Sequence, residues 1–493
     1  MKRIIIATIL ILTALFTLSA CSTPSIEISE DGYWVINGEK TDVLAKGEKG
    51  DKGDKGDKGD TGEQGKKGDK GDTGEQGLPG ADGEDGKDGG SAVDENPLGL
   101  DFFLKDDGTY AVEIGKAKYL SKIEIPATYK GKAVTEIGLF SNSGVGNEIL
   151  KEITIPESVT KIAPLAFSGC FSLTSVVIPN GVTSIGERAF FNCDSLASVV
   201  IGNGVTSIGS DAFFDCDSLT SVYISDVAAW CSIEFENQYA HPLLYAKNLY
   251  LNGELLAGDL VIPDGVEKIG MGAFLYCSGL TSVVIPDSVT SISHSAFAEC
   301  SGLTSVHISD IAAWCSIEFG NSYANPLYYA KNLYLNGELL AGDLVIPEGV
   351  EKIGMYAFYN CSSLTSVVIG NSVTSIGSSA FEDCSGLTSV VIGNSVTSIG
   401  SAAFWNCSSL TSVVIPDSVT SIGEGSFYDC DRLTSVVIPD SVTSFGDLAF
   451  ASCSSLQTVY YTGTQEQWNE ISMYDPWGYD SSAPTIIYNY IGE

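Results

Sequence analysis

The sequence predicts a repeat solenoid of stacked parallel strands with short helical closures, preceded by a stalk with glycine at every third position. Ten cysteines recur at steps of 23 residues, and two of the steps lengthen to 61 by the same 38-residue insertion. Fifteen glycines keep a strict period of three from Gly47 to Gly89. Fixed spacing of this kind indicates stacked repeats. Because 44% of the 493 residues are hydrophobic, the net charge of −36 does not indicate general disorder.

The N-terminus has the pattern of a secretory signal, which we assign to residues 1–20. Lys2 and Arg3 precede an apolar run over residues 4–18, which is too short to span a membrane comfortably. The residues Leu-Ser-Ala-Cys that end at Cys21 resemble the lipobox of bacterial lipoproteins. This resemblance implies lipidation of Cys21 and a cell-surface location in which the lipid is the only contact with the membrane. The alternative is ordinary secretion, with Cys21 lost in the cleaved peptide.

Residues 47–90 resemble the collagen-like stalks of bacterial surface proteins. Only glycine fits at the axis of three wound chains, so the period predicts a triple helix and hence a homotrimer. Proline is nearly absent, and recurring Lys-Gly-Asp triplets offer ion pairs between chains, each worth roughly 0.2–1 kcal/mol. The alternative is a monomer in which this stretch is a flexible spacer. In the preceding residues 21–46, Asn37-Gly38 predicts the turn of a short hairpin.

The repeat over residues 410–430 shows how one turn is built. Leu410, Val413 and Ile415 have the spacing of a leucine-rich-repeat strand, and Val419 and Ile422 give a second apolar edge. A glycine turn and a segment ending in Cys close the coil. Stacking such turns buries the apolar positions as ladders along one axis.

These repeats resemble the BspA-like (Treponema pallidum-type) leucine-rich-repeat family of bacterial surface proteins. The resemblance covers roughly residues 120–461 and implies adhesion or binding of host and matrix proteins. We assign residues 141–461 to the solenoid, with 38-residue insertions near 226–263 and 310–347. Residues 91–140 form a linker and N-terminal cap, and residues 462–493 form a C-terminal cap.

The recurring cysteines are predicted to be buried, reduced rungs of the core. They are Cys170, Cys193, Cys216, Cys277, Cys300, Cys361, Cys384, Cys407, Cys430 and Cys453. One inward position that recurs behaves as a small apolar residue. Neighbouring turns lie close enough for disulfides, which is the alternative. The lack of any Cys-x-x-Cys pair disfavours a zinc site, and no cofactor is expected.

Strand alternation predicts an outward face that is a candidate surface for binding a partner. Its members are Ser175, Val177, Tyr223, Val284, His307, Val368, Val391, Val414, Val437 and Tyr460. The alternative is that valine was chosen there only for its preference for strands.

The two inserted modules, residues 217–277 and 301–361, are identical at 49 of 61 positions. Each predicts a short helix carrying Trp230 or Trp314, followed by a hairpin with Asn-Gly at its turn. One interpretation is a satellite core that widens the solenoid. The other is a partner-binding bump or sugar platform formed by exposed tyrosines, namely Tyr239, Tyr245, Tyr323, Tyr328 and Tyr329.

These features predict a surface binding protein for an extracellular protein ligand. The alternatives are a carbohydrate-binding protein and a structural spacer without a specific ligand. The three histidines are scattered and no nucleophile or metal motif accompanies them, so we do not expect an enzyme. Residues 91–493 carry a net charge of −30, which disfavours nucleic acid, anionic lipid and heparin-like partners.

Overall fold

The computed structural model describes residue 96 and residues 98–140, 147–478 and 483–491, together with the backbone of three N-terminal strands. These strands are β1 (Ile26–Ile28), β2 (Tyr33–Ile36) and β3 (Glu39–Leu44). Strands β2 and β3 pair antiparallel with Ile36 opposite Glu39, which confirms the predicted hairpin. The predicted signal peptide, Cys21 and the collagen-like residues 47–90 lie outside the described residues.

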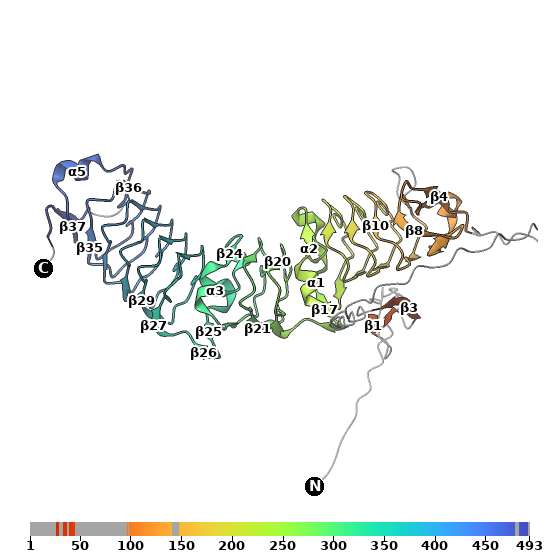
Figure 1. The fold of residues 1–493 in the computed structure, drawn as a ribbon, viewed down its shortest axis with the longest axis horizontal. Helices are drawn as coiled ribbons and strands as arrows, with labels where there is room; N and C mark the ends of the chain where they lie inside the picture. The colour runs from red at the N-terminus through yellow and green to blue at the C-terminus, as the bar shows by residue number, and fades with distance from the viewer. Residues whose placement is uncertain are drawn as a thin grey trace, which may run out of the picture.

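The rest of the chain is a solenoid of parallel strands. Figure 1 shows the turns stacked side by side in one elongated, curved row, with β4 near one end and α5 at the other. Each plain turn contributes one strand to a wide ladder and a two-residue strand to a narrow ladder. The predicted repeat solenoid is therefore confirmed.

The wide ladder is divided into three sheets. The first contains β11 (Ser175–Ile178), β13 (Ser198–Ile201), β15 (Ser221–Ile224), β17 (Leu249–Leu251) and β18 (Glu254–Leu255). The second contains β19 (Gly258–Val261), β21 (Leu280–Val284), β23 (Ser305–Ile308), β25 (Leu333–Leu335) and β26 (Glu338–Leu339). The third contains β27 (Gly342–Val345), β29 (Leu364–Val368), β31 (Ser389–Val391), β33 (Ser412–Val414), β35 (Ser435–Ile438), β37 (Thr458–Tyr461) and β38 (Thr485–Ile487).

The narrow ladder is divided at the same places. Its first part contains β4 (Asp101–Leu104), β5 (Tyr110–Glu113), β8 (Lys132–Ile137), β10 (Lys161–Ile162), β12 (Ser184–Ile185), β14 (Ser207–Ile208) and β16 (Glu234–Phe235), with β7 (Thr128–Tyr129) paired to β8. The second contains β20 (Lys268–Ile269), β22 (Ser291–Ile292) and β24 (Glu318–Phe319). The third contains β28 (Lys352–Ile353), β30 (Ser375–Ile376), β32 (Ser398–Ile399), β34 (Ser421–Ile422) and β36 (Ser444–Phe445). A separate pair joins β6 (Lys122–Glu124) to β9 (Glu152–Thr154).

Helices occur only at the insertions and near the ends of the described solenoid. They are α1 (Val227–Cys231), α2 (Leu243–Ala246), α3 (Ile311–Ser316), α4 (Leu327–Ala330) and α5 (Gln465–Glu470), with 3-10 turns η1 (Gly115–Tyr119), η2 (Gln238–Ala240) and η3 (Ser322–Ala324). Asp226 and Asp310 cap α1 and α3 through their side chains. Thr464 and Gln467 form a capping box at the start of α5.

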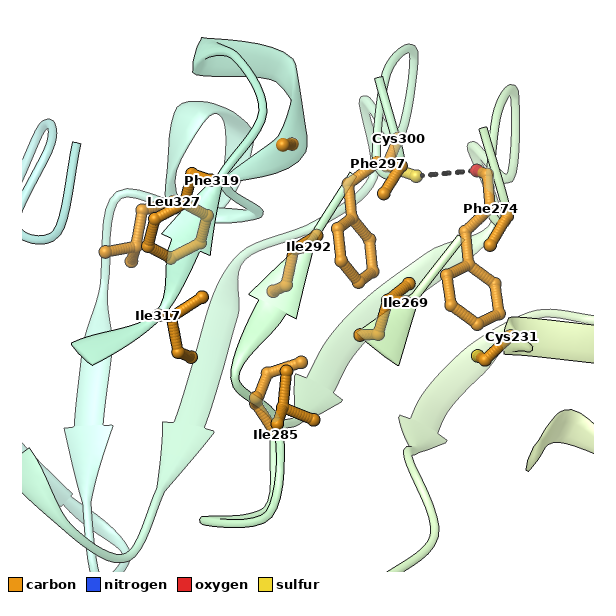
Figure 2. Close-up of a cluster of buried hydrophobic side chains, with 14 of the residues drawn as sticks. Cys231, Ile269, Phe274, Ile285, Ile292, Phe297, Cys300, Ile317, Phe319 and Leu327 are labelled. Carbon is orange, nitrogen blue, oxygen red and sulfur yellow. Dashed lines mark hydrogen bonds between the residues drawn. The ribbon is translucent and has the colours of Figure 1, made fainter. Parts of the chain in front are cut away.

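The core is one continuous column of apolar side chains in register. Stacked phenylalanines occupy one position of most plain turns, and the rings of Phe358, Phe381 and Phe404 lie 5.2 and 5.3 Å apart along the column. In the second part of the narrow ladder, Ile269 of β20 and Ile292 of β22 point inward beside Phe274 and Phe297 of the closing segments (Figure 2). Threonines support the same register from outside: the Thr397 hydroxyl donates to the Thr374 carbonyl one turn back, at 3.1 Å.

The ten recurring cysteines are buried and none forms a disulfide. The Cys300 thiol donates to the Phe274 carbonyl of the previous turn at 3.1 Å (Figure 2), and Cys407 donates to Phe381 at 3.3 Å. A thiol fits this position because it is small and apolar and still satisfies a buried carbonyl.

The closing segment of each plain turn contains two residues in the left-handed region of backbone space. In one turn these are Ala402 and Asn406, both with φ of 54°. The second position is commonly Asn or Asp, the residues other than glycine that tolerate this conformation best. At the first position Leu165, Arg188 and Ala402 carry a Cβ that costs roughly 1–2 kcal/mol.

The burial of the thiols predicts their reactivity. Burial raises the pKa of Cys170 and Cys361 to about 12, and the thiolate is the form that reacts. We expect the twelve cysteines from Cys170 to Cys453 to resist a water-soluble thiol reagent at pH 8 in the native chain. All twelve should react once the chain is denatured without reductant. Spectrophotometric thiol counting measures this, and a smaller count in denaturant would indicate disulfides.

The left-handed backbone of the closing segments predicts that two substitutions change the free energy of unfolding in opposite directions. Ala402→Gly should raise the free energy of unfolding by up to about 1 kcal/mol, because it removes the strained Cβ. Gly425→Ala, at the equivalent position one turn later, should lower it by at least about 1 kcal/mol. A Cβ on Gly425 would lie 2.8 Å from Cζ3 of Trp405. Urea unfolding measures the free energy of unfolding of both variants. Changes of the same sign would contradict the role given to the left-handed backbone.

Candidate interaction surfaces

The predicted outward residues form a column along the wide ladder, which we call the valine column. In the third sheet Val345, Val368 and Val391 occupy equivalent positions of β27, β29 and β31. The column continues through Val414 and Val437 of β33 and β35. Val345, Val391 and Val414 are each more than half exposed, at 62%, 57% and 60%. Val368 is also exposed, whereas Val437 is half-buried.

In each of the three sheets of the wide ladder, the valine column ends in aromatic or aliphatic side chains. In the first sheet the Tyr223 ring stacks on Tyr250, with centroids 4.6 Å apart. In the second, Val284 is half-buried and His307 stacks on Tyr334 at 4.7 Å. In the third, Tyr460 is half-buried and lies in register with Ile487.

The expectation of an exposed face is wrong for part of the first sheet. Val177 and Tyr223 are buried, and Ser175 is half-buried. The stacked ring of Tyr250 accounts for part of the burial of Tyr223. Val177 has ladder neighbours of the same kind as Val391, which is exposed, so its burial does not come from the ladder itself.

Sequence reasoning missed four members of the column. Val261 and Val345 are exposed and begin the second and third sheets. Tyr250 and Tyr334 end the first two, before the antiparallel strands β18 and β26. The same two-residue alternation that identified the others, applied to Leu-Tyr-Leu at 249–251 and 333–335, could have found the two tyrosines.

The inserted modules replace one plain turn each with helices and a hairpin. Trp230 and Trp314 are buried, and their indole N–H groups donate to the carbonyls of Ala273 and Ala357 at 2.6 and 2.7 Å. These tryptophans belong to the continuous core rather than to a separate satellite core. The predicted hairpin turn at Asn252-Gly253 is confirmed, since both residues have positive φ and β17 pairs antiparallel with β18.

In the second module five tyrosines lie together on the side of the solenoid formed by the closing segments, which we call the closing-loop face. We call these five residues the tyrosine cluster. They are Tyr323, Tyr328, Tyr329, Tyr356 and Tyr359. The Tyr328 ring lies 4.7 Å from Tyr323, 4.9 Å from Tyr329 and 5.7 Å from Tyr359. The Tyr356 and Tyr359 rings lie 6.0 Å apart. Tyr323 is exposed and the other four are half-buried.

Of the tyrosines singled out from the sequence, Tyr323, Tyr328 and Tyr329 are therefore brought together. Tyr239 and Tyr245 belong to the first module and are not part of the cluster. Tyr239 packs instead on Phe214 at 4.8 Å, and the Tyr245 hydroxyl accepts from the Asp215 N–H at 3.1 Å.

Carboxylates adjoin the tyrosine cluster. Burial raises the pKa of Tyr359, and the nearby charges of Glu382 and Asp383 raise it further. The pKa of Tyr328 is raised to about 12, first by its hydrogen bond with Tyr323 and then by burial. The Tyr329 hydroxyl accepts from the Glu299 N–H at 2.9 Å. The phenols therefore stay protonated at neutral pH beside the carboxylates.

The modules also differ at one buried polar position. In the second module Asn325 accepts from the Leu327 N–H at 2.9 Å and donates to the Tyr356 carbonyl at 2.7 Å. In the first, His241 accepts from the Leu243 N–H through Nδ1, while Nε2 has no hydrogen-bond partner. Burial lowers the pKa of His241 to about 3, so the ring is neutral.

Within the described part of the chain, no group of three or more His, Cys, Asp or Glu side chains is placed to hold a metal ion. Over the same residues, no helix is long and apolar enough to cross a membrane.

A parallel-strand solenoid with one apolar strand per turn is the architecture of leucine-rich-repeat proteins. Residues 115–240, 252–324 and 331–463 match the BspA type leucine rich repeat region. The chain therefore belongs to the BspA-type leucine-rich-repeat family. Residues 38–94 match the collagen triple helix repeat. No curated protein matches the chain.

Solved structures similar to the chain include three bacterial proteins. A leucine rich cell surface protein from Faecalibacterium prausnitzii is 27% identical, with 76% of this chain and 96% of that chain covered and a TM-score of 0.42. A leucine-rich repeat protein from Bacteroides ovatus is 24% identical, with 79% and 98% covered and a TM-score of 0.37. The pneumococcal vaccine antigen PcpA is 16% identical, with 79% and 91% covered and a TM-score of 0.37.

The buried histidine predicts a loss of stability in acid. The pKa of His241 is lowered from 6.5 to about 3 in the folded chain, so between these values the unfolded chain binds the extra proton. The free energy of unfolding is therefore not reduced by His241 above pH 6.5. Below that pH it falls, because only the unfolded chain takes up the proton, and at pH 4.5 the loss is roughly 2–3 kcal/mol.

His241→Asn should remove this loss, because Asn325 satisfies both hydrogen bonds in the second module. Urea unfolding at pH 7.0 and pH 4.5 measures the difference. The exposed His294→Asn is the control, and its profile should follow that of the parent chain. An unchanged acid loss in His241→Asn would contradict the assignment.

Proposed function

We propose that this chain is a lipid-anchored cell-surface binding protein that presents its solenoid to an extracellular protein ligand. The acyl group on Cys21 would be its only contact with the membrane. The collagen-like residues would hold the solenoid away from the cell as a trimeric stalk. Membership of the BspA-type family and the match of residues 38–94 to collagen repeats support this arrangement.

The exposed valine column is the observation that favours a protein ligand. Val391 and Val414 stand on adjacent strands with more than half of each side chain exposed. Apolar side chains gathered on one regular face are typical of protein interaction sites. The curvature of a solenoid makes such a face long enough to contact a large partner.

The placement of reactive groups supports binding rather than catalysis. All the described cysteines are buried with their thiols satisfied or inaccessible. His241 is buried and neutral, and His294 and His307 lie on different turns. The described cysteines and histidines, which nucleophilic and general acid–base chemistry most often uses, are therefore kept apart or away from solvent.

Val391→Lys with Val414→Lys tests the valine column in the full-length protein. Two lysines on this face should lower the affinity for a captured protein at least tenfold, because each places a charge on an apolar contact. Thr374→Lys with Thr397→Lys is the matched control, since it adds the same charges beside the narrow ladder at exposed positions. It also removes the hydrogen bonds of the two threonine hydroxyls, so thermal unfolding checks that the fold is kept.

Binding is measured by biolayer interferometry on a panel of purified matrix and serum proteins, with a glycan array in parallel. A protein ligand lost only in the valine variant supports the proposal. Glycan binding without protein binding would indicate the carbohydrate alternative. No binding on either would indicate a structural spacer and overturn the proposal.

A further inference from the structure

The two modules differ at 12 of 61 positions, and three of these changes add tyrosine to one cluster. Leu244, Gly272 and Leu275 of the first module correspond to Tyr328, Tyr356 and Tyr359 of the second. The core does not require these tyrosines, because the first module closes with the same helices and the same tryptophan hydrogen bond without them. The cluster is therefore a property of the surface of the second module.

On the next two turns, Glu382 and then Trp405 occupy the position that Tyr359 has in the tyrosine cluster. The Asn360 N–H donates to the Glu382 carbonyl at 2.7 Å, and the Asp383 N–H donates to the Trp405 carbonyl at 2.9 Å. The closing segments of these turns are thus in register, so Glu382 stands between Tyr359 and Trp405. The Trp405 ring in turn stacks on Tyr428 with centroids 4.0 Å apart.

Glu382 has no ion-pair partner among the residues that the structure describes. Its side chain is half-buried and accepts a hydrogen bond from Ser379, and burial, together with the charge of Asp383, still raises its pKa. The Asp383 carboxylate accepts from the Asn406 amide at 2.8 Å and from the Tyr359 hydroxyl. A cation bound here would offset the repulsion between the two carboxylates and the cost of burying Glu382.

We infer that the tyrosine cluster, Glu382 and Trp405 form a binding surface for a short cationic protein segment rich in lysine or arginine. The faces of tyrosine and tryptophan rings attract cations, and the adjacent carboxylates supply opposite charge. Three rungs separate Tyr359 from Tyr428, which at the ring spacing of the core is about 16 Å, or roughly five extended residues. This inference rests on the proposed function and names one place on the solenoid and the chemistry of what binds there.

The net charge of −30 over residues 91–493 attracts any polycation, so the test must separate a site from general attraction. The probe is fluorescein-labelled hexa-arginine, measured by anisotropy with the full-length protein at about 0.15 M salt, where exposed charges more than about 8 Å apart are largely screened. Glu382→Gln and Asp417→Asn each remove one negative charge. Asp417 is exposed and lies outside the surface.

We expect Glu382→Gln to weaken binding at least fivefold and Asp417→Asn to weaken it less than twofold. Equal losses would mean that net charge alone attracts the peptide, and the inference would be overturned.

A second pair of variants tests the rings. Tyr328→Leu with Tyr359→Leu restores the residues that the first module carries, so the fold should be kept; thermal unfolding checks this. It should weaken hexa-arginine binding at least fivefold, whereas Tyr239→Leu in the first module should change it less than twofold. Neutral oligosaccharide binding that is lost in the double variant would instead assign the cluster to sugars.

These outcomes are independent of the valine column. A loss of protein binding in Val391→Lys with Val414→Lys, together with uniform losses of hexa-arginine binding, would leave the proposed function standing and remove this inference. Selective loss in Glu382→Gln supports the inference whatever the valine variants do.

Discussion

The structure depends on one constraint, which is that every turn repeats the backbone positions of the turn before it. Strands of the wide and narrow ladders pair in parallel without a shift between plain turns, as at Ser375 and Ser398 or Ile376 and Ile399. The closing segments are joined by backbone hydrogen bonds as well. Neighbouring turns are therefore one strand spacing apart on all sides, and the phenylalanine rings stack at 5.2 to 5.3 Å.

This constraint explains why identical residues recur and why some are unexpected. A side chain that fits one rung fits the next, so Phe and Cys repeat as columns. The cysteine thiol is used because its S–H can reach the carbonyl of the previous turn, as Cys407 does with Phe381. The closing segment must reverse direction within few residues, so it accepts left-handed backbone even at Leu165 and Arg188. Regular stacking is maintained at the expense of local strain.

Most of the fold could be predicted from the sequence because the constraint leaves a period that can be read directly. The strand, its inward Val413 and the buried Cys407 follow from spacing alone. The exposure of an outward residue cannot be predicted in this way, because alternation determines only the direction of its side chain and not what packs against it. Val177 and Val391 have the same place in the repeat but opposite exposure. Tyr323, Tyr328 and Tyr329 could be named from the sequence of the insert, but Tyr359 could not be added to them, because Tyr328 and Tyr359 meet only once the helical insert is folded against the next turn.

The constraint also determines where this chain is free to vary. Positions that stack are held to a narrow set of residues, because a change on one rung disturbs both neighbours. Positions on the closing-loop face are not held in this way: Leu244 and Tyr328 occupy equivalent sites in two modules with the same core hydrogen bonds. A regular ladder therefore separates the residues that maintain the solenoid from those that can distinguish one turn from another. Specific recognition needs such differences, and Tyr328, Tyr356 and Tyr359 supply three of them beside the turns of Glu382 and Trp405.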